Sequence, residues 1–182
     1  MLRRWTVVLS LAGLLSILAG SAAAQISTKG NVFFGYSYNR AEIVSNDGTN
    51  LNGWNASLEG KFAPWVGLVA DISGHYGGRD FVVPVGQNPH ADITEHNFLF
   101  GPRVSAEVKG VRPFAELLIG AGHIGFDHGP SDTSFANALG GGVDYHVAGP
   151  VAVRGQLDWI HTRFFSQHQN DWRFSTGLVV HF

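Results

Sequence analysis

Charged side chains recur at every second position of several apolar segments, a spacing that places them on one face of a β-strand. Folding the chain about the turn at Lys109-Gly110 sets Arg103 opposite Glu116. A later hairpin likewise sets Asp144 opposite Arg154. Directly opposed residues of a hairpin lie within contact distance. The sequence therefore predicts two ion pairs, both on the same side of the sheet.

Lys61 with Asp71, and Asp158 with Arg173, are further candidates for diagonal pairing between neighbouring strands. Because a buried charge must be paired, we interpret the charged face as the enclosed side of the sheet, stabilised by a salt-bridge network. The predicted network consists of Glu59, Lys61, Asp71, Arg103, Glu116, Asp144, Arg154, Asp158 and Arg173.

Gly120, Gly122 and Gly125 spell the dinucleotide-binding pattern G-x-G-x-x-G. That chemistry requires the glycines to lie between a strand and a helix whose N-terminus holds the pyrophosphate. Here they end a strand-like segment and lead into a loop, so we interpret them as residues that leave room in a tight sheet. We predict no nucleotide and no other cofactor.

Six of the nine histidines lie in or near the predicted long loops. They lack the close spacing of a dedicated zinc motif, and the chain has no cysteine to complete one. We predict solvated loop histidines and no metal site, the alternative being an adventitious or regulatory metal at the outer rim. The six are His90, His96, His123, His128, His161 and His168.

Apolar and polar residues alternate without a break over residues 171–182, with Phe174 on one face and Arg173 on the other. Seven earlier segments alternate in the same way: residues 31–39, 52–62, 66–76, 95–105, 111–124, 134–147 and 151–163. Short turns alternate with long polar connections, which are residues 40–51, 77–94, 125–133 and 164–170. We therefore predict an all-β fold, an eight-stranded antiparallel transmembrane up-and-down barrel that closes by pairing its first strand with its last.

Residues 1–24 combine Arg3 and Arg4, a short apolar run and an A-x-A site at Ala24, which predicts a secretory signal peptide followed by a barrel domain at 25–182. Without the two arginines, 10 basic residues stand against 14 acidic ones. No basic stripe indicates nucleic acid as a partner. After residue 24 no segment has the roughly 20 apolar residues of a membrane helix, so any membrane span consists of strands.

Over the whole mature length the chain resembles the small eight-stranded outer-membrane β-barrels of the OmpA/OmpX type. Residues 34–38, 97–103 and 113–120 carry the resemblance. It implies residence in the Gram-negative outer membrane, contact with outer-membrane lipid and lipopolysaccharide, and insertion by the barrel-assembly machinery. In that family the machinery reads a terminal Phe with alternate apolar residues, and the matching positions are Phe174, Leu178, Val180 and Phe182.

His161-Thr162-Arg163 resembles the His-x-Ser element of the outer-membrane lipid A deacylases, which are also eight-stranded barrels. Arg163 stands where the nucleophilic serine would be, and Ser166 is out of register. We therefore predict a structural or adhesin-like surface role without catalysis, in which the long loops bind an extracellular ligand. The alternatives are a narrow-pore channel, a deacylase-like enzyme and a soluble periplasmic barrel of the lipocalin type.

Overall fold

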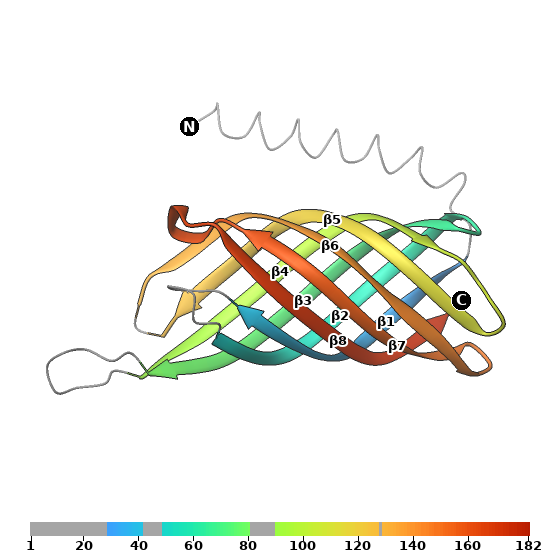
Figure 1. Cartoon of the computed structure of the whole chain (residues 1–182), viewed down its shortest axis with the longest axis horizontal. Coiled ribbons are helices and arrows are strands. Elements are labelled where there is room, and N and C mark those ends of the chain that lie inside the picture. Colours follow the sequence, from blue (N-terminus) through green and yellow to red (C-terminus); the bar gives the residue numbers. More distant parts are fainter. Residues whose placement is uncertain (1–28, 42–48, 81–89, 128) are drawn as a thin grey trace, which may run out of the picture.

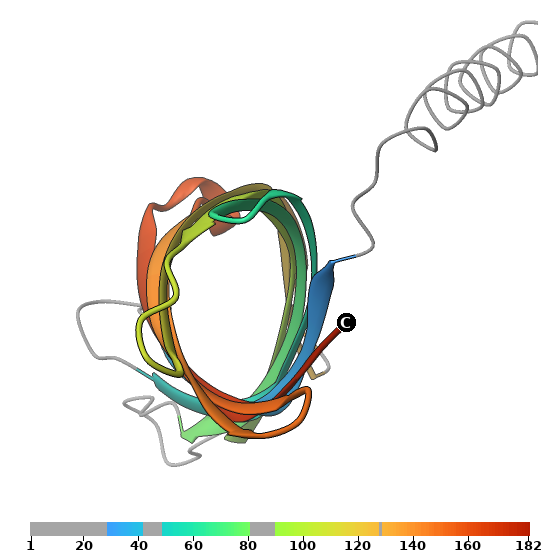
Figure 2. The same ribbon diagram turned by 90° about the vertical axis from the view of Figure 1, so that its right-hand side faces the viewer.

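Eight antiparallel strands close into a barrel in sequence order, with β1 beside β8 (Figures 1 and 2). The computed structural model describes residues 29–41, 49–80, 90–127 and 129–182, so the predicted signal peptide and parts of the predicted loops lie outside the described residues. The strands are β1 (Gly30–Ala41), β2 (Thr49–Ala63), β3 (Val66–Asp80), β4 (His90–Ser105), β5 (Val111–Phe126), β6 (Ser131–Ala148), β7 (Val151–Thr162) and β8 (Gln169–His181). A short 3-10 helix, η1 (Phe164–Ser166), joins β7 to β8.

The two ends of the barrel differ in their connections. At one end the Gly30 N–H donates to the Phe182 carbonyl at 2.9 Å, and the Phe182 N–H donates to the Gly30 carbonyl at 3.0 Å. We call this end, with its connections at 64–65, 106–110 and 149–150, the turn end, and the opposite end the loop end. At the loop end, β3 extends to Asp80 and β4 begins at His90 (Figure 1). The predicted closure of the first strand on the last is confirmed.

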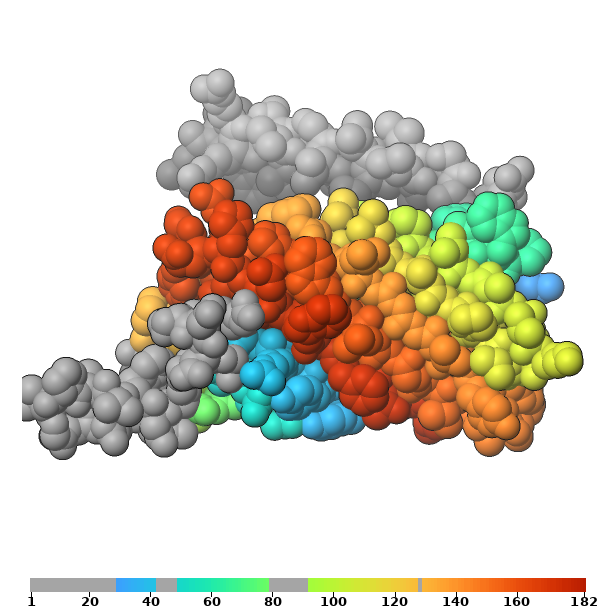
Figure 3. Space-filling model, viewed as in Figure 1, coloured from blue at the N-terminus to red at the C-terminus, as the bar shows by residue number. Residues whose placement is uncertain are grey.

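Apolar side chains cover the outside of the barrel, and charged side chains point inward, as the alternation predicted. Leu178 is 59% exposed, whereas Arg173 in the same strand is 0% exposed. In the space-filling view the side chains of neighbouring strands cover the wall continuously (Figure 3). Among the described residues, no helix is long and apolar enough to cross a membrane. Large outward apolar residues include Phe34, Leu58, Phe98, Leu117, Leu139, Leu157 and Phe174.

The strands are longer at the loop end than the sequence predicted. β3 and β4 stay paired as far as Asp80 and His90, inside the predicted loop 77–94. Polar residues that favour loops can also join a ladder when their side chains bond across it. The Tyr38 hydroxyl, for example, donates to Asn50 Oδ1 at 2.7 Å, and Asn50 belongs to β2. The loop predictions at these positions were therefore too long.

Pro102 lies within β4, where its missing N–H would interrupt a ladder. It pairs with Leu68 of β3 on one side. On the other side the pairing with β5 stops after Phe100 and resumes at Arg103 in the same register. The strand therefore accepts the proline at the cost of a local gap, without a register shift.

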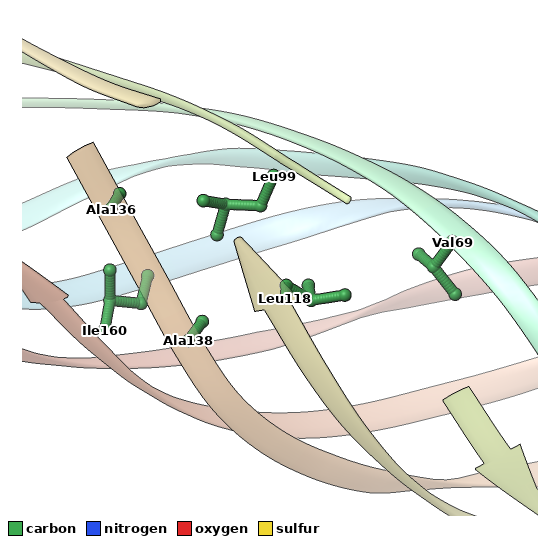
Figure 4. Close-up of a cluster of buried hydrophobic side chains, with 6 residues drawn as sticks. All are labelled: Val69, Leu99, Leu118, Ala136, Ala138 and Ile160. Atoms are coloured by element: carbon green, nitrogen blue, oxygen red, sulfur yellow. The ribbon is translucent and has the colours of Figure 1, made fainter. Parts of the chain in front are cut away.

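The barrel interior combines apolar clusters with polar side chains. One cluster occupies the wall formed by β3 to β7 (Figure 4). A second lies at the loop end and a third near the turn end, and polar residues fill the space between them. The first cluster consists of Val69, Leu99, Leu118, Ala136, Ala138 and Ile160. This filling leaves the polar side chains enclosed, and they are the first candidates for a functional site.

Candidate functional site

Arg103 joins two carboxylates in the half of the interior nearer the turn end. β4 and β5 place Arg103 directly opposite Glu116, the register that the hairpin geometry predicted. Arg103 Nη2 lies 2.6 Å from Glu116 Oε2, and Nη1 lies 3.3 Å from Glu59 Oε2. Asn31 donates to Glu59 at 2.6 Å. All four of these side chains are buried, so the ion pairs and the Asn31 hydrogen bond replace the hydration that the charges lose inside the barrel.

Arg154 forms a second buried pair, with Asp144, which lies directly opposite it. Its Nε lies 2.6 Å from Asp144 Oδ1 and its Nη2 donates to Oδ2 at 2.9 Å. The ring of Phe114 contacts two guanidinium groups, with its centroid 4.6 Å from Cζ of Arg154 and 4.3 Å from Cζ of Arg103. A Cβ at Gly142 would lie 2.7 Å from Phe114 Cζ, so this glycine makes room for the ring. The aromatic ring attracts both cations by cation–π interaction.

Arg173 occupies the centre of the interior and contacts two further carboxylates. Asp158 lies directly opposite it rather than diagonally, which corrects the prediction for this pair. Arg173 Nη2 lies 2.8 Å from Asp158 Oδ2, and Nη1 lies 2.8 Å from Asp71 Oδ1. Gln156 Nε2 donates to Glu116 and to Asp158, each at 2.9 Å. The glutamine thereby connects the central charges with those nearer the turn end.

The predicted pairing of Lys61 with Asp71 is wrong. The β2–β3 register places Lys61 opposite Gly67, four residues and about 13 Å along the strand from Asp71. Lys61 Nζ instead lies 3.3 Å from Glu59 Oε1 and donates to Ser105 Oγ at 2.7 Å. Lys61 therefore belongs to the group of charges around Arg103.

A third polar group lies nearer the loop end and was not predicted from the sequence. Ser37 Oγ lies 2.8 Å from His75 Nε2. The buried Glu95 carboxylate accepts hydrogen bonds from Asn39 at 3.0 Å and from Asn97 at 2.7 Å. The β3–β4 register places His75 directly opposite Glu95, but the predicted connection between these strands was the long loop 77–94, which fixes no register, so hairpin pairing could not find them. Their inward positions in the alternating strands were the signal that was available.

An apolar plug closes the interior above this group at the loop end. Phe164 is fully buried in it and comes from η1, where Phe165 (φ 50°) and Ser166 (φ 62°) adopt left-handed backbone conformations. The plug consists of Ala41, Leu51, Ile93, Ile124 and Phe164. From the turn end to the loop end, the enclosed space is filled first by paired charges, then by hydrogen-bonded polar side chains and finally by the apolar plug. An eight-stranded barrel is just wide enough to be filled in this way.

The motifs that could support catalysis or cofactor binding have ordinary surroundings. The glycines 120–125 lie inside β5, and the next described element is the strand β6 rather than a helix. His161 contacts Asn170 and His168, and no serine hydroxyl is among its hydrogen-bond partners in the described residues. The side chain of Arg163 is exposed. Within the same residues, no group of three or more His, Cys, Asp or Glu side chains could hold a metal ion.

Two features of the chain terminus lie at the barrel surface. Phe174, Leu178, Val180 and Phe182 all point outward from the last strand and its end. Beside Phe182, a cavity of about 520 Å³ opens at the turn end, with Lys29, Lys61, Arg112 and His181 in its lining. At its edge, Arg112 Nη2 lies 2.6 Å from Glu107 Oε2, and this hydrogen bond lowers the pKa of Glu107.

Comparison with known proteins gives one family and a set of similar structures. The family model described as the outer membrane protein beta-barrel domain matches residues 10–182. Comparison with curated protein sequences gives no significant match.

Three similar solved structures share the fold at low sequence identity. Neisserial surface protein A, NspA, has a TM-score of 0.68 at 13% identity, over 86% of this chain and 100% of NspA. Ail of Yersinia pestis, in complex with the heparin analogue sucrose octasulfate, has a TM-score of 0.57 at 16% identity, over 83% of this chain and 97% of Ail. OprG from Pseudomonas aeruginosa has a TM-score of 0.57 at 11% identity, over 87% of this chain and 97% of OprG. At these identities the three structures support the fold alone.

Proposed function

The chain belongs to the outer membrane protein β-barrel domain family and is a protein of the Gram-negative outer membrane, and from this premise we propose that it acts as a surface-interaction protein with a closed core and without catalysis. In outer-membrane barrels short turns are periplasmic and longer loops are extracellular. We therefore assign the loop end to the cell exterior and the turn end to the periplasm. The ligand-binding surface then lies at the loop end.

The observation that carries this proposal is the extension of β3 and β4 beyond the aromatic residues of the outer surface. Tyr76, which is 47% exposed, pairs with Thr94, and interfacial aromatics of this kind mark the edge of the lipid. The two strands continue from there to the pair of Asp80 with His90. A paired hairpin that continues past the lipid boundary presents a rigid surface outside the membrane, where a ligand or another cell can reach it.

The filled interior supports a closed core. Arg103, Arg154 and Arg173 all form buried ion pairs within the barrel, and the plug around Phe164 lies above them. An ion that crossed the barrel would have to break these pairs, which costs several kcal/mol for each charge that is left buried and unpaired. We expect no conductance steps when the purified protein is inserted into planar lipid bilayers. Regular steps would favour the narrow-pore channel instead.

The test of the surface role is a variant with a shortened hairpin. Replacing residues 79–91 with Asn-Gly would join Gly78 to Asp92, which already face each other, through a two-residue turn that suits antiparallel strands. Gram-negative cells that display the intact chain are compared with cells that display this variant, for adhesion to immobilised heparin, to extracellular-matrix protein and to one another. Heparin is included because Ail has been solved with a heparin analogue.

We expect adhesion to at least one of these surfaces and its loss in the shortened variant. Arg112→Met at the turn end serves as the control and should retain adhesion, because this residue faces the periplasm in the proposed orientation. The gel mobility of unheated and heated samples reports whether each variant is folded. Equal adhesion of cells with the intact chain, cells with the shortened variant and cells without the protein would contradict the proposal. A change in the mass of lipid A would instead indicate an enzyme.

Insertion is the second part of the proposal. We propose that the barrel-assembly machinery reads the outward apolar set of the last strand, Phe174, Leu178, Val180 and Phe182, and that lipid and lipopolysaccharide contact the outer surface. The exposure of all four side chains on one face supports this assignment. Phe182→Ala should lower the amount of folded protein in the outer membrane without changing the stability of the protein refolded from urea.

A further inference from the structure

Two histidines converge at the loop end, outside the interior network. His161 is the penultimate residue of β7, and His168 precedes the first residue of β8. His161 Nε2 lies 3.2 Å from His168 Nδ1, and the two ring centroids are 5.3 Å apart. Stacked rings would bring their faces together, but here one nitrogen of each ring points toward the other ring. The two ring planes are inclined to each other by 22°, so the contact joins the nitrogen-bearing edges of two nearly parallel imidazoles.

Asn170 determines which nitrogen of His161 carries the proton. His161 Nδ1 lies 3.0 Å from Asn170 Oδ1, and a carboxamide oxygen accepts hydrogen bonds but does not donate them. Nδ1 of His161 is therefore protonated, and its Nε2 keeps a free lone pair directed toward His168. Histidines that bind metals are usually oriented in this way, with the second ring nitrogen donating to a neighbouring acceptor.

The separation of the two nitrogens matches that of two ligands on one metal ion. Tetrahedral zinc with Zn–N bonds of about 2.0–2.1 Å separates two imidazole nitrogens by about 3.3 Å and their ring centroids by about 5.2 Å. The observed values are 3.2 Å and 5.3 Å. Binding therefore requires only a small rotation of the rings and a change of the His168 tautomer, because the backbone already holds both side chains in place.

We propose that His161 and His168 form a two-histidine site for Zn²⁺ or another divalent ion that prefers imidazole, with Asn170 as the positioning residue. Water, or a donor atom of a bound molecule, completes the coordination, since two protein ligands leave open positions on a tetrahedral ion. The side chain of His168 is exposed, so ions can enter from solvent. The site does not depend on the proposed surface role, because neither histidine belongs to the β3–β4 hairpin.

The experiment uses the folded full-length mature barrel, purified in detergent without a histidine tag. Zn²⁺ is titrated calorimetrically into the protein and into variants His161→Ala, His168→Ala and Asn170→Ala. We expect the wild-type protein to bind one Zn²⁺, and each histidine variant to bind it at least 10-fold more weakly. Asn170→Ala should weaken binding about 10-fold, the usual effect of removing an outer-shell partner.

His123→Ala is the matched control, since His123 is an exposed histidine of the same half of the barrel whose Nδ1 lies 2.7 Å from Thr133 Oγ1. It should bind Zn²⁺ like the wild type. Electron paramagnetic resonance of added Cu²⁺ should show hyperfine coupling to two nitrogens in the wild type and to one in His168→Ala. Unchanged Zn²⁺ affinity in both histidine variants, or coupling to a single nitrogen in the wild type, would show that the contact is only a hydrogen bond.

Discussion

Replacing Arg173 with methionine should be among the most destabilising changes in this barrel. The guanidinium contacts Asp158 and Asp71, each at 2.8 Å, and all three side chains are buried. Removing one partner of a buried pair costs about 3–5 kcal/mol, because the remaining charge stays uncompensated. Arg173 serves two carboxylates, so we expect a loss near the upper limit, about 5 kcal/mol. That loss corresponds to a fall of roughly three to four orders of magnitude in the folding equilibrium constant.

The assay is equilibrium unfolding in urea, with the barrel in lipid vesicles and tryptophan fluorescence and gel mobility as the two readouts. Arg112→Met is the matched control, since Arg112 pairs with Glu107, whose side chain is 65% exposed. An exposed pair contributes at most about 1 kcal/mol. The control should therefore unfold at nearly the wild-type urea concentration.

A compensated variant separates the loss of charge balance from the loss of packing. Asp71→Asn and Asp158→Asn, combined with Arg173→Met, remove all three charges and should recover most of the stability, because neutral replacements of a buried pair are often tolerated. A cost of less than about 1 kcal/mol for Arg173→Met, or a triple variant as unstable as the single one, would show that these ion pairs do not stabilise the barrel.

Three further predictions concern packing, lipid contact and pH. Gly140→Val should prevent folding in vesicles, because a Cβ at this position meets the Asp158 carboxylate. Gly155→Ala is the control: a Cβ at residue 155 has no atom within 4 Å, so this variant should fold normally by the gel-mobility assay. Leu157→Arg places a charge on the lipid face at mid-strand and should cost about 2–4 kcal/mol in urea unfolding. The hydrogen bond from Arg112 lowers the pKa of Glu107, so the contribution of Glu107 to folding stability is present above the ordinary pKa of 4.5 and is lost as the pH falls through the lowered pKa. Glu107→Gln should therefore lower the free energy of unfolding by under about 1 kcal/mol at pH 7 and leave it unchanged in strong acid, as measured by urea unfolding.

Period-2 alternation was enough to predict the number of strands, the closure of the barrel and the direction of the side chains. The face of each strand toward lipid requires apolar residues, whereas the face toward the enclosed interior carries polar and charged ones. The same logic located Arg103 opposite Glu116, since a tight turn fixes the register of a hairpin. It failed for Lys61 although the turn at 64–65 is tight, because the hairpin, with an irregularity between Lys61 and Ala63, places Lys61 opposite Gly67, too far along the strand from Asp71 for a diagonal contact. A diagonal contact needs the pairing to be right to within one residue.

The strand ends and the neutral polar side chains could not be predicted in the same way. Asn50 is a loop-former by composition, yet the Tyr38 hydroxyl bonds to it across the ladder, and such a contact depends on the register of two strands. Gln156 connects two groups of charges through hydrogen bonds to residues on β5 and on its own strand. Distances across the barrel depend on its curvature, which no single hairpin specifies. The pair of His161 with His168 likewise depends on the path of η1.

The hydrogen bonds between Gly30 and Phe182 lie at the seam where the first strand of the barrel meets the last, and this seam has a consequence for biogenesis. The cylinder cannot be completed until β8 has been synthesised and delivered, because the seam requires both β1 and β8. Until then, two unsatisfied edges would be available for pairing with other chains. We therefore expect the chain to stay unfolded until it reaches the outer membrane and to close its seam in one late step.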